Sequence, residues 1–120
     1  MQKIKQLTEE TTKAVHHIIL ESLEDAKAQE ITVLDVSHLT SITDHMIICN
    51  GTSARHMHSM AKKVIDAIRE SGFHIMTTEG FGSSDWLIVD CGDAVVHIMS
   101  KDSRGFYHLE GLWDIKLAAE

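Results

Sequence analysis

Three aspartates and one Gly-Thr-Ser segment are the residues of this 120-residue chain whose types suit phosphoryl-transfer chemistry. Residues 51–53 follow an apolar run and precede a helical pattern, and backbone amides at such a helix start can hold a phosphate. Asp35, Asp90 and Asp93 carry the carboxylate oxygens that Mg²⁺ prefers. That chemistry is available only if the fold brings these groups together.

The spacing of the aspartates argues against such a site. Two carboxylates share one face of a strand when one residue separates them, whereas D-C-G-D at 90–93 places Asp93 in a turn. The loop also lacks the G-K-[ST] and G-x-G-x-x-G signatures of phosphate-binding loops. We therefore keep a nucleotidyltransferase-like nucleotide binder only as an alternative, and we expect Asp35 to cap backbone amides at a strand end.

Hydrolysis and metal binding have weaker support. Ser53 lies outside the G-x-S-x-G context of a nucleophilic serine, and neither Cys49 nor Cys91 has an activating motif. Asp90 and His97 are conceivable metal ligands, yet two ligands do not make a site. We expect no catalytic residues, no metal site and no cofactor.

The clearest structural element is a β-hairpin over residues 86–99. Two β-branched apolar runs flank Gly92-Asp93, and a glycine in the first of two loop positions suits a type II′ turn. Counting from that turn pairs Ile88 with His97 and makes Asp90 a diagonal neighbour of His97 on the same face. We expect Asp90 and His97 to brace the two strands through a hydrogen bond.

The rest of the chain alternates helical and strand patterns without an internal repeat. Apolar residues at spacings of three and four predict helices over 3–25 and from Ser53 to Gly72, and a short helix from 101 to about 109. Short apolar runs predict strands at 31–36, 46–49, 73–78, 86–91 and 94–99. The order predicts a single α/β domain over residues 1–120, with a mixed five-stranded sheet and helices packed on its faces.

Composition limits the partners and the compartment. Eighteen acidic against eleven basic residues give a net charge of −7. This balance disfavours direct, sequence-specific nucleic-acid binding and favours a basic protein partner. No apolar run is long enough for a membrane helix, and no signal peptide is evident. Two cysteines without C-x-x-C spacing are typical of buried free thiols in a reducing compartment, so we expect a cytoplasmic protein.

Four motifs occur in one order with short gaps between them. They are D-H-M-I-I-C-N-G-T-S-A-R-H-M at 44–57, E-G at 79–80, D-W-L-I-V-D-C-G-D-A-V-V-H-I-M at 85–99 and Y-H-L-E-G-L-W at 107–113. Together they resemble the ribosomal silencing factor family, also called the Iojap-like family. The resemblance extends from about Ile31 to Trp113, and the N-terminal helix is compatible with it.

The resemblance implies an α/β domain similar in topology to nucleotidyltransferases but without their activity, often as a homodimer. It implies binding to the large ribosomal subunit through ribosomal protein fourteen of its intersubunit face. A factor bound there sterically blocks joining of the small subunit and lowers translation when nutrients are scarce. Organellar relatives act in late assembly of the large subunit, so an assembly factor is a second alternative. Either role requires no enzyme activity.

Carried over motif by motif, the resemblance places the partner-binding residues in two segments. The first segment, at the start of the hairpin, contains Trp86 and Leu87. The second segment, the C-terminal motif, contains Tyr107, Leu109, Glu110, Leu112 and Trp113. Core packing is the alternative for each aromatic residue; it is favoured for Trp113 and stays open for Tyr107. His45 and His108 depart from the family pattern, and His108 stands where an acidic residue is common.

Overall fold

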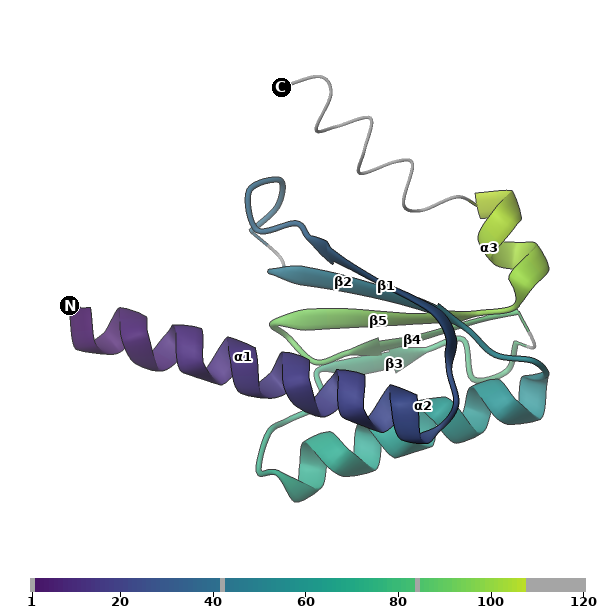
Figure 1. Ribbon diagram of the computed structural model, residues 1–120, viewed down its shortest axis with the longest axis horizontal. Coiled ribbons are helices and arrows are strands. Elements are labelled where there is room, and N and C mark those ends of the chain that lie inside the picture. The colour runs from purple at the N-terminus through teal and green to yellow at the C-terminus, as the bar shows by residue number, and fades with distance from the viewer. Residues whose placement is uncertain (1, 42, 84, 108–120) are drawn as a thin grey trace.

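Five strands form a single sheet in the order β1-β2-β5-β4-β3 (Figure 1). The computed structural model describes residues 2–41, 43–83 and 85–107. The strands are β1 Gln29–Asp35, β2 His45–Asn50, β3 Thr77–Glu79, β4 Trp86–Asp90 and β5 Ala94–Met99. Strands β2 and β5 run parallel, and the other three neighbouring pairs are antiparallel. The predicted mixed five-stranded sheet is confirmed.

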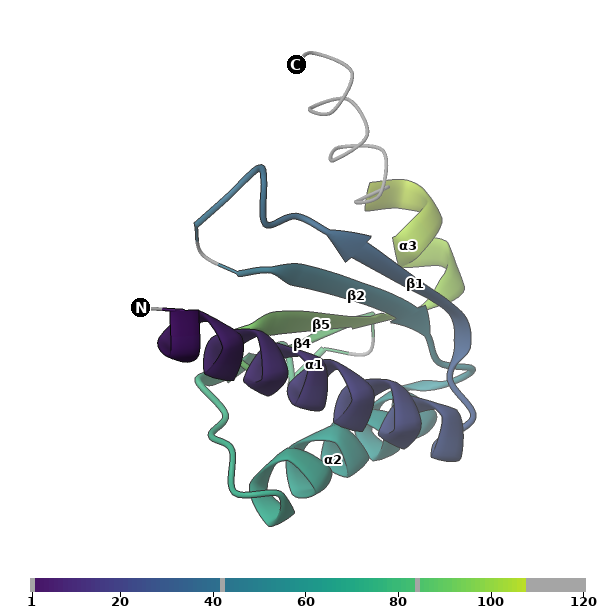
Figure 2. The same ribbon diagram turned by 60° about the vertical axis from the view of Figure 1, so that its left-hand side comes forward.

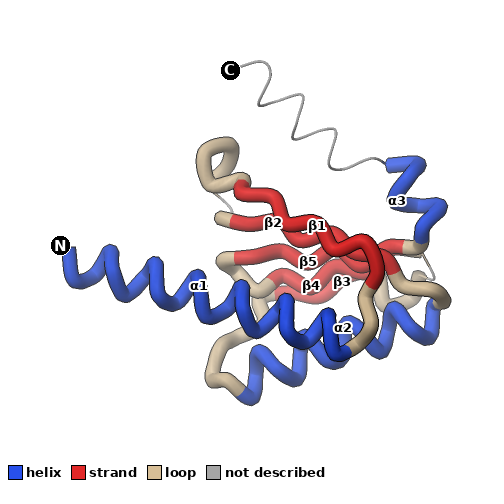
Figure 3. Tube along the Cα trace, viewed as in Figure 1, coloured by secondary structure: helices blue, strands red, loops and turns tan. Residues whose placement is uncertain are grey.

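Three helices lie in the described part of the chain, and its elements follow the predicted order α-β-β-α-β-β-β-α (Figure 3). They are α1 Gln2–Asp25, α2 Ala54–Glu70 and α3 Lys101–Tyr107. Ser53 is the N-cap of α2, as predicted, because its side chain accepts a hydrogen bond from the His56 N–H at 3.1 Å. Gly72 follows the helix with φ +86°, a conformation that suits glycine at a helix end.

The core lies between the sheet and the two long helices (Figure 2). Buried residues at spacings of three or four line the two helices: Val15, Ile19 and Leu23 on α1, and Met57, Met60, Val64 and Ile68 on α2. Alternate residues of three strands pack against them from the sheet: Ile47, Cys49, Leu87, Val89, Val96 and Ile98. The predicted flanking helices are confirmed, and the two long ones, α1 and α2, pack side by side on one face of the sheet.

The opposite side of the sheet, which we call the second face, is defined by strand alternation and register. Its residues are Thr32, Leu34, Met46, Ile48, Asn50, Thr77, Glu79, Trp86, Ile88, Asp90, Val95, His97 and Met99. Neither α1 nor α2 packs on this face, and α3 lies at one end of it (Figures 1 and 2). The two long helices therefore leave the second face uncovered, although Ile48 and Met99 on it are fully buried.

The strand predicted at 73–78 is misplaced, since β3 spans only Thr77–Glu79. Phe73 and Ile75 pack against the core as part of the connection that leaves α2, and the N–H of Phe73 bonds the carbonyl of Ile68. Sheet pairing begins only where the Met76 N–H reaches the Asp90 carbonyl. The apolar alternation reflected packing of this connection against the core.

Both cysteines are free and buried, as predicted. Burial raises the pKa of the Cys49 and Cys91 thiols to about 12. Because the thiolate is the reactive form, we expect neither thiol of the native protein to react readily with a disulfide reagent at neutral pH. Thiol titration before and after denaturation measures this; rapid reaction of the native protein would contradict the burial.

Candidate functional site

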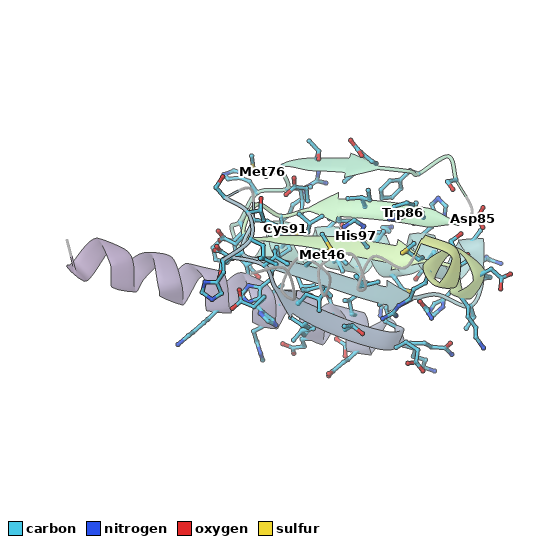
Figure 4. All side chains as sticks on the ribbon, turned by 90° about the horizontal axis from the view of Figure 1, so that it is seen from above. Met46, Met76, Asp85, Trp86, Cys91 and His97 are labelled. Atoms are coloured by element: carbon cyan, nitrogen blue, oxygen red, sulfur yellow. The ribbon has the colours of Figure 1, made fainter. Side chains whose placement is uncertain are left out.

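Four half-buried apolar side chains from three neighbouring strands run along the second face. They are Met46 on β2, Trp86 and Ile88 on β4, and Val95 on β5. Figure 4 views the sheet from this side and shows Trp86 and His97 next to each other on neighbouring strands. A contiguous apolar surface with one large aromatic residue is typical of a protein-binding site.

The Trp86 indole is held by His97. Its Nε1–H donates a hydrogen bond to Nδ1 of His97 at 3.0 Å, and the two ring centroids lie 5.8 Å apart. Only 7% of His97 is exposed, and this burial lowers the pKa of its imidazole to about 4. His97 is therefore neutral at physiological pH and can accept the indole proton.

The predicted brace between Asp90 and His97 is wrong. Oδ1 of Asp90 accepts the N–H of Gly92 at 2.8 Å and so caps the hairpin loop instead. The register itself is confirmed, with Ile88 opposite His97. Gly92 has φ +84°, and the Asp93 N–H bonds the Cys91 carbonyl at 3.1 Å, the pattern of a γ-turn rather than the predicted type II′ turn.

Leu87 does not belong to the surface on which Trp86 lies. Adjacent strand residues point to opposite faces, and Leu87 is 0% exposed in the core beneath α2. Leu87 is therefore a core residue and not part of the proposed partner-binding surface. Tyr107 is the last residue of α3, whereas the predicted partner residues Leu109, Glu110, Leu112 and Trp113 lie outside the described residues.

Met46, Ile88 and Val95 were not among the sequence candidates. Ile88 carried a usable signal, because it lies two residues from Trp86 on the same strand. Met46 and Val95 could be placed only once the parallel pairing of β2 with β5 was known.

Arg104 was also missed, and it fastens α3 to the edge of the second face. Its guanidinium donates to Oγ1 of Thr32 at 2.7 Å, to Oδ1 of Asn50 at 3.2 Å and to the carbonyl of Glu30. Glu30 has φ +51° at a register shift in β1, which presents this carbonyl to the helix. These contacts fix the helix that leads into the C-terminal motif.

The loop before β4 approaches Trp86 closely. Gly80 has φ +83°, and a Cβ atom at this position would overlap the backbone carbonyl oxygen of Trp86. The Ser83 N–H donates a hydrogen bond to the Gly80 carbonyl at 2.8 Å, which closes the loop. Glycine at position 80 of the E-G motif is thus required for the chain to approach Trp86 in this conformation.

His58 on α2 holds the same loop through its ring. Its Nδ1 lies 2.8 Å from the Ala54 carbonyl oxygen and its Nε2 lies 2.9 Å from that of Phe81. Both partners are acceptors, so only the protonated ring donates both bonds. Hydrogen bonds first to Phe81 and then to Ala54 raise the pKa of His58.

We expect these bonds to hold the loop more firmly at about pH 6 than at about pH 8. A raised folded-state pKa means that the stabilisation is complete below the unfolded pKa and is lost as pH rises through the folded value. NMR titration should give His58 a pKa above the ordinary value of a histidine side chain, and the amide protection of residues 80–83 should fall as pH rises through it. A His58 pKa at or below that ordinary value would contradict the two-carbonyl geometry.

The phosphoryl-transfer constellation is not assembled. Register places Asp35 beside His45 and Ala94 at one end of β2 and β5, whereas residues 51–53 follow the other end. The two ends are roughly 17 Å apart over a six-residue strand. Among the described residues no group of three or more His, Cys, Asp or Glu side chains could hold a metal ion.

The residues of that hypothesis have local structural roles instead. Asp35 caps the following turn, as predicted, because Oδ1 accepts both the side-chain hydroxyl and the backbone N–H of Ser37, which lowers the pKa of the carboxyl. Nδ1 of His56 accepts the Thr52 N–H at 2.9 Å, while its Nε2 lies 2.7 Å from the Ala26 carbonyl. His56 therefore ties this loop to the end of α1.

These features define an α/β domain whose candidate site is a surface on one sheet face. The family model described as ribosomal silencing factor during starvation matches residues 9–120. A ribosomal silencing factor from Haemophilus influenzae is 43% identical over 100 residues, which are 83% of this chain and 98% of the relative. This chain therefore belongs to the ribosomal silencing factor family.

Other relatives extend the comparison. A Mus musculus protein named for mitochondrial assembly of the ribosomal large subunit is 32% identical over 82% of this chain and 45% of its own length. A crystal structure of a Chromobacterium violaceum protein superposes with a TM-score of 0.83 at 38% identity, over 85% of each chain. A Bacillus halodurans structure gives a TM-score of 0.77 at 30% identity, over 84% of this chain and 94% of that one.

Within the described part of the chain, no helix is long and apolar enough to cross a membrane.

Proposed function

We propose that this protein binds the large ribosomal subunit through ribosomal protein fourteen of its intersubunit face and sterically blocks joining of the small subunit. This binding represses translation under nutrient limitation. The observation that carries the proposal is the second face, where Trp86 lies among half-buried apolar residues of three strands on a side that neither long helix covers. Steric occlusion requires such a surface and no reactive group.

Charge supports a basic partner. The net charge of −7 favours association with a positively charged protein, because complementary charge speeds and orients encounter. Large aromatic and aliphatic side chains supply the energy at the centre of such interfaces. The proposed partner-binding residues are those of the second face together with the C-terminal motif: Met46, Trp86, Ile88, Val95, Tyr107, Leu109, Glu110, Leu112 and Trp113.

A subunit-joining assay tests this function. Purified protein is added to large subunits before or after small subunits, and joined ribosomes are separated on a sucrose gradient. We expect pre-incubation to lower the joined fraction in proportion to the protein bound, and addition after joining to have less effect. Binding without any loss of joining would contradict the occlusion mechanism.

A role in assembly of the large subunit is the second candidate, supported by the name of the mouse relative. A deletion strain separates the two roles. Silencing predicts mature large subunits and excess joined ribosomes during starvation, whereas an assembly role predicts accumulation of immature large subunits during growth.

We further propose that the protein is cytoplasmic, homodimeric and not an enzyme. Sedimentation equilibrium measures its mass in solution, and a monomer at micromolar concentration would contradict the dimer. Nucleoside triphosphates with Mg²⁺ should leave the melting temperature unchanged, because a specific ligand would raise it.

A further inference from the structure

We propose that His97 is a positioning residue: it holds the Trp86 indole so that the ring carbons, and not the ring N–H, meet the partner. This inference rests on the proposed function, in which Trp86 is the anchor. It assigns a role to a residue that does not itself lie on the contact surface, since His97 is almost fully buried.

The direction of the hydrogen bond fixes both rings. An indole N–H can only donate, so Nδ1 of His97 is the acceptor and the neutral ring carries its proton on Nε2. His97 lies on β5, the strand between β2 and β4, and Ile88 is its cross-strand neighbour. Because β5 is hydrogen-bonded to a strand on each side, the acceptor on His97 is held in place and orients the half-buried indole.

The bond also restricts the chemistry of the partner. The Trp86 N–H already has its acceptor inside the protein at 3.0 Å, so a partner gains nothing by offering a carbonyl or carboxylate oxygen to it. What the ring offers is carbon surface and the negative face of its π system. Aliphatic side chains and Arg or Lys groups fit that surface, and cations over an indole face are attracted by its quadrupole. A basic partner supplies such groups.

Comparison of two variants that break the same bond tests the inference. His97→Phe removes the acceptor while keeping a ring of similar size, and Trp86→Phe removes the donor while keeping a ring. His97→Asn restores an acceptor oxygen near the position of Nδ1. His74→Phe, the same substitution at an exposed histidine, is the matched control.

We expect His97→Phe to weaken binding to large subunits about tenfold. We expect His97→Asn to recover most of that loss and His74→Phe to bind normally. In the Trp86→Phe background the indole N–H is already absent, so His97→Phe should cause no further loss and W86F/H97F should bind as Trp86→Phe does. In ¹⁵N NMR spectra, the Trp86 indole N–H should exchange with water faster in His97→Phe.

Additive losses in the double variant would overturn the inference, since they would mean that His97 acts independently of Trp86. Normal binding by His97→Phe would also overturn it while leaving the proposed function intact, provided that Trp86→Ala has lost binding. Normal binding by Trp86→Ala would instead refute Trp86 as the anchor. If His97→Phe fails to fold, the hydrogen-exchange rate of the Trp86 indole N–H in the wild-type protein tests the inference instead. Exchange as fast as that of a free indole N–H would contradict the hydrogen bond.

Discussion

Replacing Trp86 with alanine is expected to abolish co-sedimentation of the protein with large ribosomal subunits. Trp86 is the largest side chain of the second face and begins β4, with Ile88 two residues away on the same strand. Loss of a tryptophan that anchors an interface costs about 2 kcal/mol or more, which is roughly a thirtyfold or greater loss of affinity. Co-sedimentation at micromolar protein measures it, and the joining assay should lose inhibition in parallel.

A matched control comes from the opposite side of the sheet. Val33 is a large apolar residue that is 37% exposed, and its register with Ile47 places it on the face that carries the helices. Val33→Ala should therefore bind as the wild-type protein does. Circular dichroism and thermal melting should show that both variants are folded. If Trp86→Ala is folded and still co-sediments, Trp86 is not the anchor.

The substitution Gly80→Ala is expected to lower both stability and binding. Its φ of +83° is unfavourable for alanine, and the added Cβ would overlap the backbone oxygen of Trp86. Together these effects should lower the free energy of unfolding by about 3 kcal/mol. Relief of the overlap requires the start of β4 to move, which displaces Trp86 from its place on the second face. Denaturant unfolding measures the first effect and co-sedimentation the second.

Gly82→Ala is the control within the same loop. No atom lies within 4 Å of a Cβ atom at Gly82, and its φ is not positive. We expect its stability and binding to match those of the wild-type protein within experimental error. Equal losses in the two glycine variants would mean that general loop stiffness, rather than the close approach to Trp86, determines the effect.

Local chemistry explains why much of the fold could be predicted. The N-cap at Ser53, the position of the turn at Gly92 and the hairpin register between Ile88 and His97 depend on residues close in sequence. The cap at Asp35 likewise depends on a hydroxyl two residues away. Such elements follow from hydrogen-bonding groups and backbone preferences that a short segment contains.

The parts that could not be predicted depend on choices between distant partners. Asp90 and His97 were placed correctly on one face, yet each found a closer partner: the Gly92 amide and the Trp86 indole. The sequence pattern also does not reveal which face the helices cover, so Leu87 was grouped with Trp86 although alternation separates them. Arg104 contacts residues more than fifty positions away, which no local pattern reveals.

Photo-crosslinking from the second face tests the central claim most directly. A photoreactive amino acid replaces Ile88, which is half-buried beside Trp86, and in a control protein it replaces the exposed Lys62 on α2. After irradiation with large subunits, crosslinked proteins are identified by mass spectrometry. We predict a crosslink from position 88 to ribosomal protein fourteen and none from position 62. A crosslink to that protein from position 62, with none from position 88, would contradict binding through the second face.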